Sequence, residues 1–74
     1  PLIALNGGID GLSEIRKVIY RSFKLLKSNG KLILEIGFNQ KNDVKKILKK
    51  KGFYINEVVK DLAKNNRCII STKI

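Results

Sequence analysis

Residues 31–38, Lys-Leu-Ile-Leu-Glu-Ile-Gly-Phe, are the segment that most limits the folds open to this chain. The apolar residues of this segment barely alternate with polar ones, and Gly30 and Asn39 bound it. A short apolar run of this kind is typical of a strand covered on both faces, as in a parallel sheet. We therefore expect an α/β fold with a buried strand at residues 31–38.

A helix is predicted before this strand, at residues 13–29. Ser13 suits the N-cap position, and Asn29-Gly30 supplies a left-handed residue to end the helix. Apolar and small side chains recur at helical spacing along it, namely Ile15, Val18, Ile19, Ser22, Phe23 and Leu26.

A second helix is predicted after the strand, at residues 40–51. Its apolar stripe consists of Val44, Ile47 and Leu48, with lysines around it. Asn39 suits the cap at its start, and Gly52 is a stop signal at its end.

The two ends of the chain differ in pattern. Residues 1–12 predict a loop, because glycines punctuate them and no strand of convincing length precedes the glycines. Residues 53–59 and 67–72 predict two strands joined by a polar turn, hence an antiparallel hairpin. The predicted order is loop-α-β-α-β-β, with a right-handed strand–helix–strand crossover, in one domain spanning residues 1–74.

Charge and cysteine usage narrow the function classes. Sixteen Lys and Arg against six Asp and Glu give a net charge of +10. Such a charge favours anionic partners such as RNA. Thirteen of the sixteen are lysines, however, so a compositional bias explains the charge equally well, and we do not favour RNA binding by this segment.

Little in the sequence indicates catalysis. The chain has no histidine and a single cysteine, so it offers no metal constellation and no nucleophile–histidine arrangement. One cysteine forms no internal disulfide, which suits the reducing cytoplasm, and no apolar run is long enough to span a membrane. We expect Cys68 to be a buried small hydrophobe.

Glu35 and the pair Asp61 and Arg67 are the polar residues that need an explanation. Glu35 interrupts an apolar strand near its end, where α/β sheets place their sites, but we favour a structural role in which it bonds to a loop or to backbone amides. Asp61 and Arg67 flank the predicted turn and are expected to pair across it.

Several motifs, taken together, resemble the release-factor glutamine methyltransferases, the HemK/PrmC family. They are Pro1-x-x-Ala4-Leu5-x-Gly7-Gly8-x-Asp10-Gly11-Leu12, Leu34-Glu35-Ile36-Gly37-x-x-Gln40, Gly52-Phe53, and Lys60-Asp61-Leu62-Ala63 followed by Arg67. The resemblance covers essentially the whole chain. It departs from the family at Lys64, where glycine is common, so Asn65 or Asn66 is expected to take the left-handed position instead.

The resemblance implies that the chain is the C-terminal portion of a class I S-adenosylmethionine-dependent methyltransferase, a Rossmann-like sheet. It implies that the parent enzyme uses S-adenosylmethionine to methylate the glutamine of peptide-chain release factors. The family's cofactor-binding and catalytic motifs lie in its other part, so no catalytic, cofactor or metal residue is assigned here, and the chain alone is expected to be inactive without its N-terminal half. Gly7, Gly8, Asp10 and Gly11 are the candidates for an edge of the substrate groove.

Three alternatives stay open from the sequence. The chain is a stand-alone basic module that binds RNA, part of a nucleic-acid methyltransferase of the same fold, or a decayed gene product. An RNA module would need exposed aromatic side chains, whereas the five aromatics appear at positions expected to be mostly buried. If the chain is isolated, the strand at residues 31–38 would present an unpaired edge and drive self-association.

Overall fold

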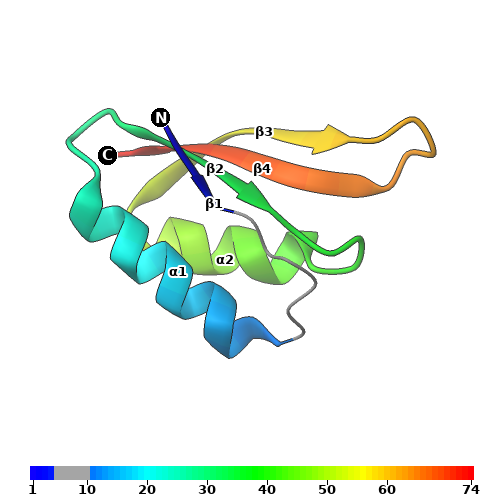
Figure 1. Cartoon of the computed structure of the whole chain (residues 1–74), viewed down its shortest axis with the longest axis horizontal. Coiled ribbons are helices and arrows are strands. Elements are labelled where there is room, and N and C mark those ends of the chain that lie inside the picture. Colours follow the sequence, from blue (N-terminus) through cyan, green and yellow to red (C-terminus); the bar gives the residue numbers. More distant parts are fainter. Residues whose placement is uncertain (5–10) are drawn as a thin grey trace.

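The computed structural model describes residues 1–4 and 11–74. In this part of the chain, two helices lie against one face of a four-stranded sheet (Figure 1). The elements in chain order are β1 (Leu2–Ala4), α1 (Leu12–Leu25), β2 (Lys31–Glu35), α2 (Lys41–Lys51), β3 (Phe53–Lys60) and β4 (Asn66–Lys73).

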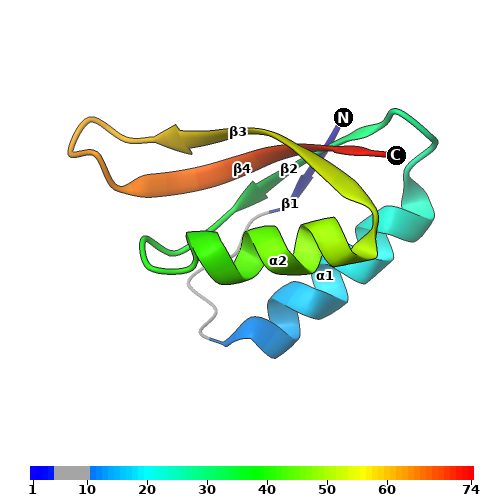
Figure 2. The ribbon, with the colours of Figure 1, turned by 180° about the vertical axis from the view of Figure 1, so that it is seen from behind.

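The strands lie in the order β1-β2-β4-β3. β1 is parallel to β2, and β4 is antiparallel to both β2 and β3. β3 therefore runs in the same direction as β2, with β4 inserted between them. The two helical connections step across the sheet in the same direction, so a common hand puts both helices on one face. Figure 2 shows the same single helical layer from behind.

The core lies between the helices and the sheet. Its buried apolar side chains come from every element except β1, and they are Ile15, Ile19, Leu32, Leu34, Val44, Ile47, Leu48, Phe53 and Ile69, together with Ile36 after β2. The predicted apolar stripes of both helices face this core. At 25 cal/mol per Å² of apolar area, burying each of these side chains stabilises the fold by roughly 1.5–3 kcal/mol.

Residues 1–12 were expected to form a loop, and this is wrong for residues 2–4, while residues 5–10 lie outside the described part of the chain. Leu2–Ala4 is a strand that pairs with Leu32–Leu34. Three residues are too few to show a strand pattern, and their conformation is fixed by the neighbouring backbone of β2. The edge of β2 is therefore paired with β1 along residues 32–34. The expectation that the chain self-associates through an unpaired edge at residues 31–38 loses its basis.

Strand β2 also differs from its prediction, in which it is covered on both faces. Leu32 and Leu34 are buried towards the helices, while Lys31 and Glu35 are exposed on the opposite face. β2 also ends at Glu35 rather than at residue 38. Within the described residues, helices cover one face of the sheet only, and Ile33 between the two leucines is half-buried.

Helix α1 begins and ends earlier than predicted. Gly11 is its N-cap, with φ 103° and no side-chain cap bond, so Ser13 is not the cap. The helix ends at Leu25 rather than residue 29, because Leu26 is already extended. Asn29 does adopt the left-handed conformation, φ 69°, but it does so in the turn that leads the chain into β2.

Helix α2 starts at Lys41, with Gln40 rather than Asn39 at its N-cap. It ends at Lys51 as predicted, and Gly52 is its C-cap, with φ 124°. That conformation favours glycine, and a Cβ there would also lie 3.0 Å from Cε1 of Phe23. Gly52 therefore lets Phe53, the first residue of β3, pack against Phe23, with the two ring centroids 5.6 Å apart.

The antiparallel hairpin of β3 and β4 is confirmed. Its turn contains a residue with positive φ, which is Lys64 (φ 69°) rather than Asn65 or Asn66. Lys64 therefore adopts a left-handed backbone conformation that glycine would adopt without strain, and its side chain makes this conformation sterically unfavourable.

Candidate functional site

The candidate site lies at the carboxyl edge of the sheet, which we define as the end where the parallel strands β1 and β2 finish, at Ala4 and Glu35. Open α/β sheets place their binding sites outside this end of their strands. Because β4 is antiparallel to β2, its first residues and the β3–β4 turn lie at the same edge. The backbone N–H of Ile36 donates a hydrogen bond to the carbonyl oxygen of Arg67 there, at 2.9 Å.

Of the four residues predicted to line a substrate groove, Gly7, Gly8 and Asp10 lie outside the described residues. Gly11 is described. It begins α1, which runs back along the sheet from the carboxyl edge, and an added Cβ would meet no atom within 4 Å. The exposed backbone at Gly11 is thus accessible, and its φ of 103° explains why glycine stands here.

Glu35 is exposed at the end of β2, on the sheet face opposite the helices. The favoured interpretation gave it a hydrogen bond to a loop or to backbone amides. Among the described residues, no hydrogen bond or ion pair of its carboxylate is found. In the sheet, its neighbour on β4 is Cys68.

The turn after β2 is built by Gly37 and Gln40. The backbone N–H of Gly37 donates a hydrogen bond of 2.7 Å to Oε1 of Gln40, and the backbone N–H of Gln40 donates one of 3.1 Å to the carbonyl oxygen of Gly37. This reciprocal pair shapes the entry into α2. Sequence reasoning missed it, although the Gly-x-x-Gln spacing of three residues was the available signal.

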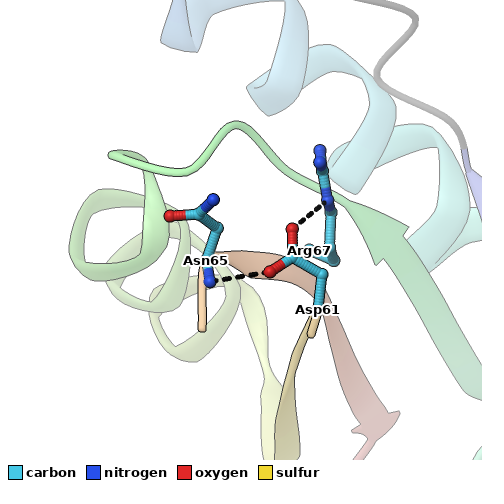
Figure 3. Close-up of polar contacts among 3 residues, drawn as sticks. All are labelled: Asp61, Asn65 and Arg67. Carbon is cyan, nitrogen blue, oxygen red and sulfur yellow. Dashed lines mark hydrogen bonds and ion pairs between the residues drawn. The ribbon is translucent and has the colours of Figure 1, made fainter. Parts of the chain in front are cut away.

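The turn between β3 and β4 is closed by Asp61, as Figure 3 shows. One carboxylate oxygen accepts a hydrogen bond from the backbone N–H of Asn65 at 2.9 Å, and the other accepts one from Nε of Arg67 at 3.0 Å. The predicted pairing of Asp61 with Arg67 is confirmed. The Asn65 N–H, more than the Arg67 charge, lowers the pKa of the Asp61 carboxyl. These contacts give Asp61 a structural role in the turn.

Cys68 is half-buried rather than buried, on the same sheet face as Glu35. Partial burial raises the pKa of its thiol, and the nearby carboxylates of Glu57 and Glu35 raise it further. A raised pKa leaves little thiolate at neutral pH, which makes Cys68 a poor nucleophile.

The described residues contain no group of three or more His, Cys, Asp or Glu side chains placed to hold a metal ion. In the same part of the chain, no helix has the length and apolarity required to cross a membrane.

The sheet face opposite the helices carries apolar side chains. Ile3 and Tyr54 are exposed on this face, and Ile33, Ile70 and Val59 are half-buried on it. This face is of the kind that a further layer of structure covers in α/β proteins.

Known proteins resemble this chain along almost its whole length. A release factor glutamine methyltransferase of Thermodesulfovibrio yellowstonii is 47% identical over 73 residues, which are 99% of this chain and 26% of that protein. One from Clostridium acetobutylicum is 40% identical over 73 residues, again 99% of this chain and 26% of that protein. A protein of Rickettsia felis named bifunctional methyltransferase is 42% identical over 74 residues, the whole of this chain and 14% of that protein.

No family model and no solved structure matches the chain. The chain spans about a quarter of the length of the release factor glutamine methyltransferases it matches. The matched part is their C-terminal region. By sequence, the chain is therefore related over its full length to the C-terminal part of the release factor glutamine methyltransferases, the HemK/PrmC family.

Proposed function

We propose that this chain forms the C-terminal part of the catalytic domain of a class I methyltransferase that modifies the glutamine of peptide-chain release factors. The observation that carries the proposal is the 47% identity over 73 residues to a protein of that name. The mixed sheet, with one helical layer and an apolar opposite face, supports it, because such a sheet is suited to join a larger α/β domain. The cytoplasm, inferred from cysteine usage, belongs to the same proposal.

The donor in this proposal is S-adenosylmethionine, and the described residues do not fit it. The donor is a net cation, because its sulfonium and ammonium groups outnumber its single carboxylate. Three hollows on the described surface, of about 340, 320 and 290 Å³, are lined mainly by arginine and lysine side chains, which repel such cations. We propose that the remainder of the enzyme binds the cofactor and supplies the catalytic residues, and that residues 1–74 alone are inactive.

Calorimetry and a methyl-transfer assay test whether cofactor binding and catalysis reside outside residues 1–74. We expect the isolated chain to bind no S-adenosylmethionine and to transfer no methyl group to a release factor. Saturable binding of the cofactor to residues 1–74 would contradict the proposal, because it would place a cofactor site within this part.

The contribution we propose for this chain is an edge of the substrate groove, formed by Gly7, Gly8, Asp10 and Gly11. Gly11, the described residue of the four, lies at the carboxyl edge of the sheet with accessible backbone, which supports the proposal. In the intact enzyme, Asp10→Ala is expected to lower the rate of methylation of release factor while leaving the affinity for S-adenosylmethionine unchanged.

The matched control is Asp43→Ala, which removes an exposed carboxylate from the first turn of α2. It should leave both the rate and the affinity unchanged. Equal losses of rate and of cofactor affinity in Asp10→Ala would show that the loop acts on the fold or the cofactor and not on the substrate.

A further inference from the structure

A groove runs between the two helices and is lined by cationic side chains. Arg16 and Tyr20 of α1 face Lys46 and Lys50 of α2 across a hollow of about 320 Å³, with Ile47 beneath. We call these five residues the interhelical groove. Lys46 and Lys50 are four residues apart on α2, so their side chains lie on the same face of the helix, about 6 Å apart along its axis.

Among the described residues, no acidic side chain forms an ion pair with Arg16, Lys46 or Lys50. An adjoining hollow of about 340 Å³ is lined by Lys17 and Arg21 together with Arg16 and Tyr20 of the groove. On the other side, a hollow of about 290 Å³ on α2 is lined by lysines and Asn42. The acidic residues of the two helices, Glu14 and Asp43, are in the first turns, and Glu14 is 3.3 Å from the Lys17 ammonium.

Tyr20 is the aromatic residue of the groove, and 46% of it is exposed. The Lys51 ammonium lies 4.5 Å from the centroid of its ring, in a cation–π contact with one face of the ring. The aromatic residues were expected to be mostly buried, and this is wrong for Tyr20, Phe38 and Tyr54, which are exposed. Tyr20 lies beside the buried Ile19, one position off the apolar stripe of α1.

An exposed aromatic ring among uncompensated cations has the two components of a site for single-stranded nucleic acid. Cations contact the phosphates, and the ring offers a surface on which a base stacks. An acidic protein surface would use the charges but would have no need of the ring.

We propose that the interhelical groove binds single-stranded RNA, with Tyr20 stacking on a base and Arg16, Lys46 and Lys50 contacting phosphates. The proposal rests on the geometry of α1 and α2 and stands independently of the methyltransferase function. On this proposal, the positive charge of α1 and α2 has a recognition function and is not only a compositional bias.

Fluorescence anisotropy tests the proposal, with the 74-residue chain and a fluorescein-labelled oligouridylate of about 12 nucleotides. Affinity is measured across a series of salt concentrations. The charge variant is Arg16→Gln with Lys50→Gln. Its matched control is Lys60→Gln with Lys64→Gln, which removes the same charge from exposed positions at the far end of the hairpin (Figure 1).

The aromatic variant is Tyr20→Ala, matched by Tyr54→Ala on the opposite face of the sheet, where Tyr54 is also exposed. Circular dichroism verifies that each variant is folded. The four substitutions at charged positions are at exposed residues, so the charge comparison stands even if a tyrosine variant is unstable.

The proposal predicts that Tyr20→Ala weakens binding about tenfold and that Tyr54→Ala changes it less than twofold. The groove charge variant should lower the slope of log affinity against log salt by about 1.4, at about 0.7 per phosphate contact. Equal losses in the groove and hairpin charge variants would overturn the proposal, because binding would then be diffuse attraction to a basic protein. Binding to anionic lipid vesicles but not to the oligonucleotide would overturn it as well.

Discussion

Lys73, near the end of β4, is predicted to contribute strongly to stability by capping the C-terminal end of α1. Its ammonium donates hydrogen bonds to the carbonyl oxygens of Phe23 and Leu26, at 2.7 and 2.8 Å. It also lies 4.2 Å from the centroid of the Phe23 ring. A cation at this place meets the negative end of the helix dipole and carbonyl groups that the helix itself leaves without partners. The perturbation is Lys73→Met, which keeps most of the length of the unbranched side chain and removes the ammonium.

The magnitude follows from the contacts that are lost. A hydrogen bond from a charged donor contributes about 1.5–3 kcal/mol, and a partly exposed cation–π contact about 0.5–1 kcal/mol. The two bonds share one ammonium, whose partial desolvation offsets part of the gain, and methionine keeps most of the apolar stem of the lysine. We therefore expect Lys73→Met to lower the free energy of unfolding by about 2 kcal/mol, which corresponds to a fall in Tm of about 8–16 °C for a domain of this size.

The assay is thermal and urea unfolding of the chain followed by circular dichroism, with Lys24→Met as the matched control. Lys24 is in the last turn of α1 and exposed, so it shares the charge and the helix end but has none of the bonds described for Lys73. Its substitution should cost less than about 0.5 kcal/mol. If the two variants lose equal stability, the effect is one of net charge, and the capping argument is refuted.

Three further predictions concern backbone conformation and pH. Gly52→Ala should lower the free energy of unfolding by about 2 kcal/mol, because Gly52 has positive φ and the new Cβ would press on Phe23. Gly11→Ala should cost less, since Gly11 also has positive φ but has open space around the new Cβ. Equal losses in urea unfolding would argue against the contact with Phe23. Lys64→Gly should raise stability by about 1 kcal/mol in urea unfolding, because glycine adopts φ 69° without steric cost, and a lowered urea midpoint would contradict this. The lowered pKa of Asp61 stabilises the folded state above the ordinary carboxyl pKa of about 3.9, and this contribution is lost as the pH falls through the lower pKa of the folded state. Asp61→Asn should therefore make stability fall less steeply below about pH 4, and parallel acid unfolding curves for the two proteins would count against it.

The sequence predicted those elements whose signals are local and repeated. The apolar stripe from Ile15 to Leu26 predicted which face of α1 is buried, because apolar residues at helical spacing lie on the face that packs against the core. Gly52 marked the end of α2, since few other residues adopt its conformation. The hairpin followed from two apolar segments around a polar turn, and the contact between Asp61 and Arg67 from their places beside that turn.

The features that the sequence did not predict depend on tertiary contacts. β1 is a strand because β2 lies beside it, and three residues alone have no period. α1 stops at Leu25 although Leu26 is apolar, because residues 26–30 turn into the sheet, where the N–H of Asn29 donates to the carbonyl oxygen of Lys73 at 2.8 Å. For the candidate site, the Gly37 and Gln40 pair was visible only as a spacing. The interhelical groove brings together residues about 30 positions apart, which no local pattern relates.

We propose that this chain serves as the C-terminal part of a release factor glutamine methyltransferase. The most direct test is a chimera in which residues 1–74 replace the matched C-terminal region of the Thermodesulfovibrio yellowstonii enzyme. Methylation of a release factor is measured for the chimera, for the intact relative and for the relative truncated before that region. We expect the truncated protein to be inactive and the chimera to methylate the release factor. A chimera that folds and binds S-adenosylmethionine but transfers no methyl group to the release factor would contradict it.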